Sequence, residues 1–256
     1  GFLVSGMLIP MIVPIDTPLW MIALATAFAV VFAKEVFGGT GYNIFNVALV
    51  TRAFLFFAYP AAMSGDKIFV RTADTFGLGA GSVVDGFSGA TPLGIASTAT
   101  SGTGYPAFSM DMITGLIPGS IGETSVIAIA IGAVLLLWTG IASWKTMLSV
   151  FVGGALTACM FNAIGMENNA MANMPWYEHL VLGGFCFGAV FMATDYVTSP
   201  MTKRGSLIYG AGIGLLTVLI RIFGSYPEGM SFSILIWNGL TPLINTYIKP
   251  KHFGGR

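Results

Sequence analysis

The segment SVIAIAIGAVLLLWTG, residues 125–140, contains no charged side chain. Similar apolar runs recur along the 256-residue chain, which is 55% hydrophobic and 9% charged. Soluble domains carry about 25% charged residues, so this composition excludes an ordinary soluble domain. The 11 basic and 11 acidic side chains balance, which leaves no basic surface for nucleic acid. The sequence therefore indicates an integral membrane protein.

Apolar segments of membrane-spanning size recur through the chain. A bilayer core of about 30 Å needs about 20 apolar residues in each helix. Eight candidate spans are residues 1–13 (incomplete), 18–33, 47–62, 125–140, 147–164, 179–194, 207–223 and 230–248. The 34 glycines favour helices that pack closely on one another. We predict an all-α polytopic bundle, one transmembrane domain over residues 1–256, and a longer protein whose N-terminal part precedes Gly1.

The basic residues outside the spans predict the orientation. Lys67 and Arg71 fall on one side of the membrane. The opposite side carries Lys34, Lys145, Lys203, Arg204, Lys249, Lys251 and Arg256. Cytoplasmic loops are enriched in Lys and Arg, so the second side should be cytoplasmic. The long glycine-rich segment 63–124 should then face outward, and segments of this length are often functional.

The most specific string in this outer segment is Asp85-Gly86-Phe87-Ser88-Gly89-Ala90-Thr91. It resembles the flavinylation motif, an acid followed by Ser-Gly-Ala-Thr, in which a separate flavin transferase joins FMN to the Thr hydroxyl through a phosphoester bond. Small residues around the hydroxyl leave room for the flavin and the transferase. A turn rich in Gly and Ser is the alternative reading of the same residues. The resemblance implies covalent FMN on Thr91, with Asp85, Ser88, Gly89 and Ala90 around it.

Other strings extend this resemblance over nearly the whole chain. They are KEVFGGTG (34–41), RAFLFFAYP (52–60), PGSIGETS (118–125), MATD (192–195) and YPEG (226–229). Together they resemble the B subunits of the Na⁺-translocating NADH:quinone oxidoreductases, with the D subunits of Rnf complexes as the neighbouring possibility. The resemblance implies a urea-transporter-like bundle of ten spans in a bacterial inner membrane, of which about eight are present.

The same resemblance implies an electron-transfer function. Covalent FMN would lie toward the outer face and non-covalent riboflavin toward the cytoplasm, and electrons would pass between them to ubiquinone, coupled to Na⁺ export. The other subunits of the complex would be partners, and NADH would bind one of them. The protein supplies position and electrostatics, while the flavins carry the redox chemistry.

The riboflavin region of the family matches residues 38–46, in which Asn43 and Asn46 are the candidate ligands. Carboxamides donate and accept hydrogen bonds, as the alternating N–H and C=O edge of an isoalloxazine requires. A glycine-rich turn with Asn caps is the alternative. The family usually has Pro after the second Asn, whereas this chain has Val47, so the geometry of the turn is open.

The family resemblance places the string GETS, residues 122–125, near the FMN. Glu123, Thr124 and Ser125 open a predicted span and either cap that helix or approach the FMN. Arg52 lies within a predicted span and needs a partner, which is either a carboxylate in a structural ion pair or the flavin.

Two acids at span ends are candidates for handling Na⁺. Asp195 follows Met-Ala-Thr, and Glu35 follows Lys34. Acids at membrane depth are costly and often functional, but both could equally be solvated at the cytoplasmic interface. The family often has an acid in the last span, where this chain has Asn245, so no carboxylate role transfers to that position.

A passive or secondary solute transporter is the rival function. A glycine-rich bundle with broken spans and a cavity at membrane depth has the same sequence signature. A solute pathway would not need Ser-Gly-Ala-Thr on the outer segment, and bound flavin distinguishes the two classes. An Rnf-type subunit linked to ferredoxin is a third possibility, which partner subunits would identify.

Overall fold

The structure is a computed structural model that describes residues 2–14, 17–60, 63, 91–99, 108–117, 119–166, 169–224 and 228–249. Every regular element within these ranges is helical, as the sequence predicts. The longer helices are α1 (Phe2–Ile12), α2 (Leu19–Ala33), α3 (Val47–Ala58), α6 (Val126–Trp138), α7 (Trp144–Ile164), α11 (Lys203–Phe223) and α12 (Met230–Tyr247). The shorter elements are the 3₁₀ turn η1 (Glu35–Phe37), α4 (Pro92–Thr98), α5 (Asp111–Thr114), α8 (Ala170–Asn173), α9 (Trp176–Val181), α10 (Phe185–Phe187) and the π-helical turn η5 (Gly188–Met192).

Polar side chains cap the starts of several helices. Ser143 accepts a hydrogen bond from the Thr146 N–H and so starts α7, and Thr202 starts α11 in the same way through Gly205. An N-cap side chain of this kind satisfies a backbone donor that the helix itself leaves free. The predicted spans 147–164 and 207–223 therefore began too late, because hydropathy does not register the polar cap and first turn of each helix.

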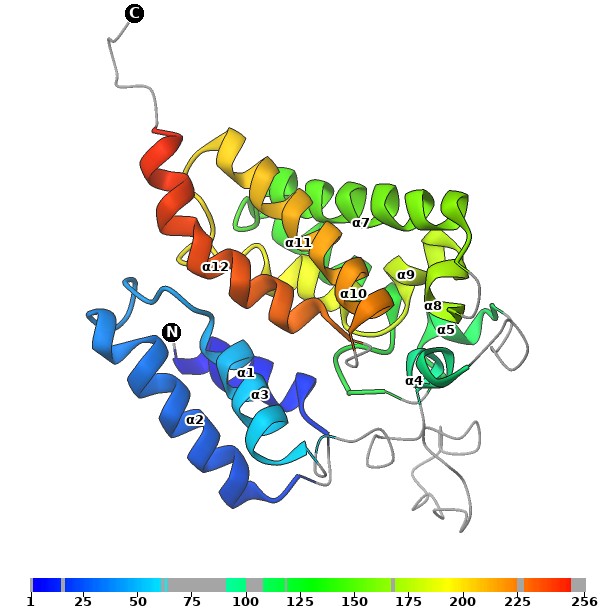
Figure 1. Cartoon of the computed structure of the whole chain (residues 1–256). Coiled ribbons are helices and arrows are strands. Elements are labelled where there is room, and N and C mark those ends of the chain that lie inside the picture. The colour runs from blue at the N-terminus through cyan, green and yellow to red at the C-terminus, as the bar shows by residue number, and fades with distance from the viewer. Residues whose placement is uncertain are drawn as a thin grey trace, which may run out of the picture.

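Helices α7 and α11 lie side by side along their length, as Figure 1 shows. Glycines allow this close approach. A Cβ on Gly153 of α7 would lie 2.5 Å from the Ala211 carbonyl oxygen, and one on Gly214 of α11 would overlap the Val150 carbonyl oxygen. The two backbones are therefore in direct contact, which is how helices associate when lipid removes the hydrophobic driving force.

Helix α3 lies between two groups of helices, of which α1 and α2 form one and α11 and α12 belong to the other. It packs against α1 and α2 on one side and against α12 on the other, beneath the α11–α12 pair in Figure 1. Its buried side chains include Leu49, Arg52 and Leu55. Because α3 lies between both groups, a polar residue on its buried face can reach partners that are distant in the chain.

The predicted span 179–194 is not one helix. Helix α9 ends at Val181, Leu182 is extended, and Gly183 adopts a left-handed φ of +65° before α10 and η5 begin. The two adjacent glycines allow this break, since Gly183 takes a conformation that other residues rarely adopt. The π-helical turn then ends shortly before Asp195, and such turns are frequent at functional sites.

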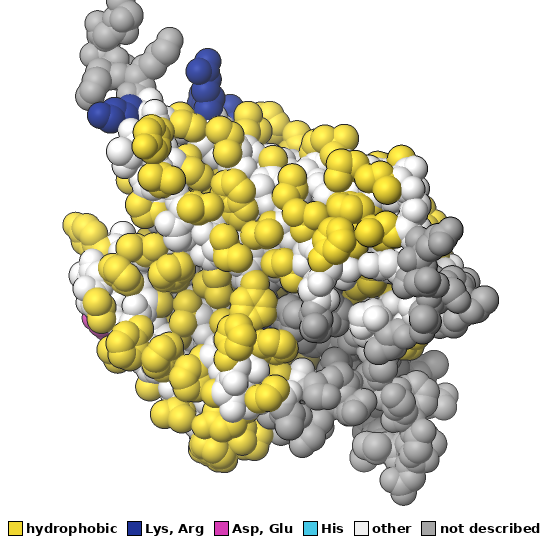
Figure 2. Space-filling model, viewed as in Figure 1, with side chains coloured by type: hydrophobic (Ala, Val, Ile, Leu, Met, Phe, Trp, Pro, Cys, Tyr) yellow, Lys and Arg dark blue, Asp and Glu magenta, His cyan; other side chains and the backbone are white. Residues whose placement is uncertain are grey.

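Three helices of the described chain are long and apolar enough to cross a membrane: Leu19–Phe37, Trp144–Ile164 and Lys203–Phe223. Helices α1, α3 and α6 are apolar but shorter. Large hydrophobic side chains cover the face of the molecule shown in Figure 2. Large hydrophobic side chains of α6 are also exposed, among them Ile131 and Val134. This surface is consistent with contact to lipid, whereas the count of eight spans and the urea-transporter-like topology remain predictions.

Candidate functional site

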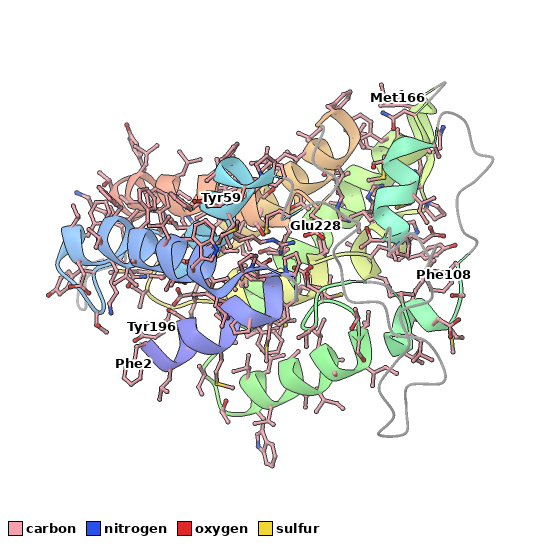
Figure 3. The ribbon with its side chains drawn as sticks, turned by 90° about the horizontal axis from the view of Figure 1, so that it is seen from below. Phe2, Tyr59, Phe108, Met166, Tyr196 and Glu228 are labelled. Atoms are coloured by element: carbon pink, nitrogen blue, oxygen red, sulfur yellow. The ribbon has the colours of Figure 1, made fainter. Side chains whose placement is uncertain are left out.

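A cavity of about 380 Å³ opens between α1, the turn before α3, the α6–α7 connection and the segment after η5. Its polar lining residues are Ser5, Lys34, Thr40, Asn43, Asn46, Thr194 and Asp195. Leu8, Leu136, Phe191 and Tyr196 are among the apolar and aromatic ones. Figure 3 shows Tyr196 and the α1 residue Phe2 at the same end of the molecule. Small-molecule sites have volumes of about 300–1,000 Å³ and this mixture of apolar walls and few polar groups.

The glycine-rich string before α3 shapes one wall of this cavity. Gly38, Gly39 and Gly41 have φ values of +116°, +88° and +96°. These left-handed conformations turn the chain sharply between α2 and α3, which is why glycine occupies those positions. The turn brings Thr40 and Gly41 to the cavity wall.

Both the oxygen and the nitrogen of the Asn46 carboxamide form hydrogen bonds. Its Oδ1 accepts from the N–H groups of Ala48 at 3.0 Å and Leu49 at 3.4 Å, so Asn46 caps α3. Its Nδ2 donates to Asp195 Oδ2 at 3.4 Å. A carboxamide has two N–H donors, so one remains for a ligand. The alternative that Asn46 caps a helix is therefore confirmed. Its role toward riboflavin stays a prediction, for which one N–H donor remains.

Asn43 is less constrained. Its Nδ2 donates to the Phe45 carbonyl at 3.3 Å, and the side chain is half-buried at the cavity wall. The carboxamide oxygen and the second N–H are not used in that bond. Asn43 can therefore both donate to and accept from a ligand.

Asp195 organises the opposite wall. Its carboxylate accepts hydrogen bonds from the Val197 N–H at 3.3 Å, from the Thr198 hydroxyl at 3.3 Å and from Asn46. Burial raises the pKa of Asp195, and the three hydrogen bonds oppose that rise. The cavity thus brings together the two asparagines predicted to bind riboflavin and the acid predicted to handle Na⁺. Asn46 and Asp195 are 149 positions apart in the chain.

The second proposed acid, Glu35, lies elsewhere. Its side chain is 55% exposed and forms an ion pair with Lys34 at 3.6 Å. It is absent from the cavity lining, so the solvated alternative fits Glu35. Across the described ranges, no group of three or more His, Cys, Asp or Glu side chains is arranged to hold a metal ion.

Thr91 lies at the N-cap of α4. Its hydroxyl oxygen accepts a hydrogen bond from the Gly94 N–H at 3.0 Å, and the residue is half-buried. The next residues, Pro92 and Leu93, are buried. Cap and packing together hold the Thr91 hydroxyl in one place. Asp85, Ser88, Gly89 and Ala90 lie outside the described residues.

Arg52 forms a buried ion cluster with two glutamates. Its Nη1 lies 2.5 Å from Glu123 Oε1, and its Nη2 pairs with Glu228 Oε2. The side chains of Arg52 and Glu123 are 7% and 5% exposed. Glu228 lies near the middle of the view in Figure 3. The predicted ion pair of Arg52 is therefore confirmed, and Glu228, which sequence reasoning missed, is a second partner.

Glu123 sits in the turn before α6, inside this cluster. Burial raises its pKa to about 7, against the opposing effects of Arg52 and of a hydrogen bond from Ser120. The carboxylate rests on the backbone of Gly184, because a Cβ at that position would overlap Glu123 Oε1. Glu123 is therefore held by Arg52 of α3, by Gly184 and by Ser120 of its own turn.

Arg221 is a second buried cation that sequence reasoning left unassigned. It donates from Nη1 to the His179 carbonyl at 2.5 Å and from Nη2 to the Leu182 carbonyl at 2.9 Å. These carbonyls belong to the end of α9, whose helical hydrogen bonds stop there. An Arg within a predicted span was the available signal, since such a residue needs a buried partner.

Gly183 and Gly184 connect α4 to the buried charges. A Cβ on Gly183 would lie 3.0 Å from Leu93 Cδ2 and 3.3 Å from Arg221 Nη2. The neighbouring Gly184 supports Glu123. Helix α4, which Thr91 caps, thus packs against Gly183, and the adjacent Gly184 contacts Glu123 of the ion cluster.

The remaining residues of the GETS string have structural roles. Ser125 caps α6 by accepting a hydrogen bond from the Ala128 N–H at 3.3 Å. Thr124 is half-buried, and a Cβ on Gly119 would lie 2.9 Å from its methyl group. Of the three, Glu123 alone reaches the cluster through its side chain.

Comparison with known proteins gives the family. The model of the NQR2, RnfD, RnfE family matches residues 1–254. Similar proteins include the B subunit of the Na⁺-translocating NADH-quinone reductase of Chromohalobacter salexigens, which is 51% identical over 249 residues. The B subunits of the same reductase from Klebsiella pneumoniae and Pseudomonas aeruginosa are 48% and 47% identical.

The alignments cover 96–97% of this chain but 58–59% of each relative, so the chain spans little more than half the length of these proteins. The extent of the match confirms the resemblance drawn from the KEVFGGTG, SGAT and GETS strings. The chain belongs to the NQR2, RnfD, RnfE family.

Proposed function

We propose that this chain acts in the membrane subunit of a Na⁺-translocating NADH:quinone reductase, with FMN on Thr91 and riboflavin in the 380 Å³ cavity. Electrons would pass between the flavins and on to ubiquinone. A flavin transferase would load Thr91 on the outward-facing segment 63–124, and the other subunits would complete the complex in a bacterial inner membrane. The names of the three similar proteins support this activity.

The cavity is the observation that carries the proposal. It offers a volume suited to a small ligand and flanks it with apolar side chains, two asparagines and a buried acid. Asn43 can donate and accept, and Asn46 keeps one donor, which matches the mixed edge of an isoalloxazine ring. Phe191 and Tyr196 line the same space and provide aromatic surface for the ring.

The surroundings of Thr91 suit a covalent attachment. A half-buried hydroxyl at a helix cap is accessible to a transferase yet fixed in position. Leu93 and Ala96 of α4 are buried, so the attached group would be held by a packed helix. The attached flavin would supply the electron-carrying chemistry, and the chain would supply its placement.

Asp195 is our proposed residue for Na⁺. A carboxylate oxygen is the ligand type that hard cations prefer, and burial makes a nearby cation favourable. Exposed Glu35 would act at most at the entrance, beside Lys34.

The test uses two pairs of variants of the protein purified from membranes after production with a flavin transferase. Fluorescence of the denatured band and the mass of the Thr91 peptide should show FMN in wild type and Thr91→Ser, and none in Thr91→Ala. Extracted riboflavin should fall in Asn43→Ala and stay unchanged in Asn173→Ala, which removes an exposed carboxamide at the end of α8.

Unmodified Thr91 and absent riboflavin in wild type would reject the electron-carrier function and favour a solute transporter. An Rnf-type assignment would instead follow if the flavins are present but the copurified subunits reduce ferredoxin rather than quinone.

A further inference from the structure

The start of α11 and the end of α12 meet at one end of the molecule, at the upper left of Figure 1. The Met201 N–H donates to Asn245 Oδ1 at 3.1 Å. A Cβ on Gly205 would lie 3.0 Å from Ile244 Cγ2. Helix α11 therefore begins against the last turn of α12, and the side chains exposed at this junction come from both helices.

Three basic side chains lie at the junction. Lys203 and Arg204 are the first two residues of α11, and Lys249 lies two residues beyond α12. All three are exposed, and Figure 2 shows Lys and Arg side chains at the upper left edge of the apolar face. Within the described ranges, the ion pairs are those of Lys34 and Arg52. The positive charge at the junction is therefore open to an anion.

Exposed apolar side chains continue from these cations along both helices. On α11, Leu207 lies four positions after Lys203 and so shares a face with it. Ile208 has the same relation to Arg204. Helix α12 carries an exposed stripe at helical spacing, made of Ile236, Leu240, Leu243 and Tyr247. Each helix thus joins an apolar strip to a basic end, and Tyr at such a boundary is typical of a membrane interface.

An anionic phospholipid has the same two-part chemistry, since a negatively charged headgroup adjoins its apolar acyl chains. Basic residues beside a membrane helix attract such lipids, whereas a zwitterionic headgroup brings no net charge. We propose that the α11–α12 junction binds an anionic phospholipid, whose headgroup contacts Lys203, Arg204 and Lys249 while its acyl chains cover the exposed apolar strips. The orientation predicted from the basic residues places this lipid in the cytoplasmic leaflet. The site is independent of the proposed flavins.

The experiment compares two lipids with identical acyl chains, dioleoylphosphatidylglycerol and zwitterionic dioleoylphosphatidylcholine. The protein is purified with its accompanying subunits, stripped of lipid in an uncharged detergent and titrated with each lipid, and native mass spectrometry measures the bound fraction. Wild type should bind the phosphatidylglycerol more tightly. Each Lys or Arg contributes about fivefold, so Arg204→Gln should weaken phosphatidylglycerol binding about fivefold and Arg204→Gln/Lys249→Gln about 25-fold. Phosphatidylcholine binding should stay unchanged, which shows that the fold is intact.

Lys145→Gln is the matched control. Lys145 is the second residue of α7, as Arg204 is of α11, and a polar side chain caps each helix. Its removal should leave the preference for phosphatidylglycerol at the wild-type value. Equal weakening by Lys145→Gln and Arg204→Gln would overturn the inference, because any cation on that side would then suffice.

Three other results would also overturn the proposal. Equal loss of both lipids in the double variant would indicate a structural defect. Displacement of phosphatidylglycerol by soluble glycerol phosphate at the same concentration would indicate a phosphate site without a lipid. Loss of an accompanying subunit from the double variant, with unchanged lipid preference, would assign the basic side chains to a protein partner.

Discussion

Replacing Arg52 by Met should strongly destabilise the protein at pH 8. The substitution keeps an unbranched side chain but leaves Glu123 and Glu228 without their shared guanidinium. Removing one partner of a buried ion pair costs about 3–5 kcal/mol, and the 5% exposure of Glu123 places this cluster in that class. For a chain of this size, 1 kcal/mol shifts the melting temperature by about 2–4 °C, so we expect a fall of about 6–20 °C.

The assay is thermal unfolding in detergent micelles, followed by tryptophan fluorescence. Arg204→Met is the control, because Arg204 is exposed on α11 and its replacement should change stability by less than about 0.5 kcal/mol. Adding Glu123→Gln and Glu228→Gln to Arg52→Met should recover much of the loss, since no charge of this cluster then remains buried. If Arg52→Met melts with wild type, or the added Gln substitutions recover nothing, the reasoning from an uncompensated buried charge is wrong.

The penalty should also depend on pH in a definite direction. Arg52 lowers the pKa of Glu123, so its removal should raise that pKa above about 7. A carboxyl whose pKa is higher in the folded state stabilises the protein at low pH and loses that contribution as pH rises. The melting temperature of Arg52→Met should therefore approach that of wild type at pH 5, where Glu123 can bind a proton.

Three further predictions concern other parts of the molecule. Glu123→Gln should flatten the dependence of melting temperature on pH between about 4.5 and 7, because wild-type stability falls as the raised pKa of Glu123 is passed, and an unchanged slope would contradict this. Gly214→Ala should destabilise by about 1–3 kcal/mol in the same thermal assay, because the added Cβ overlaps the Val150 carbonyl oxygen. Gly6→Ala has open space around it on α1 and should be neutral or stabilising, so equal effects of the two alanines would refute the packing argument. Asp195→Asn should lower riboflavin content and destabilise by about 1–3 kcal/mol, because its NH2 would replace one oxygen and face either the Val197 N–H or the donors of Thr198 and Asn46, and riboflavin retention equal to wild type would count against Asp195 as a wall of the cavity.

Local features of the fold could be predicted from the sequence. Apolar composition predicts a helical membrane protein, because an interior free of water requires backbone hydrogen bonds to close within each helix. The caps at Asn46 and Ser125 were likewise predictable, since each bonds to a backbone N–H within three residues. The family could be recognised from short motifs such as KEVFGGTG and PGSIGETS, because the residues of each motif are consecutive in the chain.

The broken segment after α9 shows where this reasoning ends. Residues 179–194 are apolar enough to suggest a span, yet Gly183 turns the chain and Arg221 binds the carbonyls at the break. A hydropathy pattern cannot show that Arg221 of α11 donates hydrogen bonds to these carbonyls. The break became visible only once the helices were packed.

The sequence by itself determined the class of protein, the caps at Asn46 and Ser125 and the family motif, because these depend on composition and on neighbours a few residues apart. Tertiary structure alone decided the partners of Arg52, which lie 71 and 176 positions away, and the pairing of Asn46 with Asp195, 149 positions away. Buried charges and hydrogen-bonding groups need partners, but the order of residues in the chain does not show which residues these partners are. Packing of α3 between both groups of helices supplies that answer.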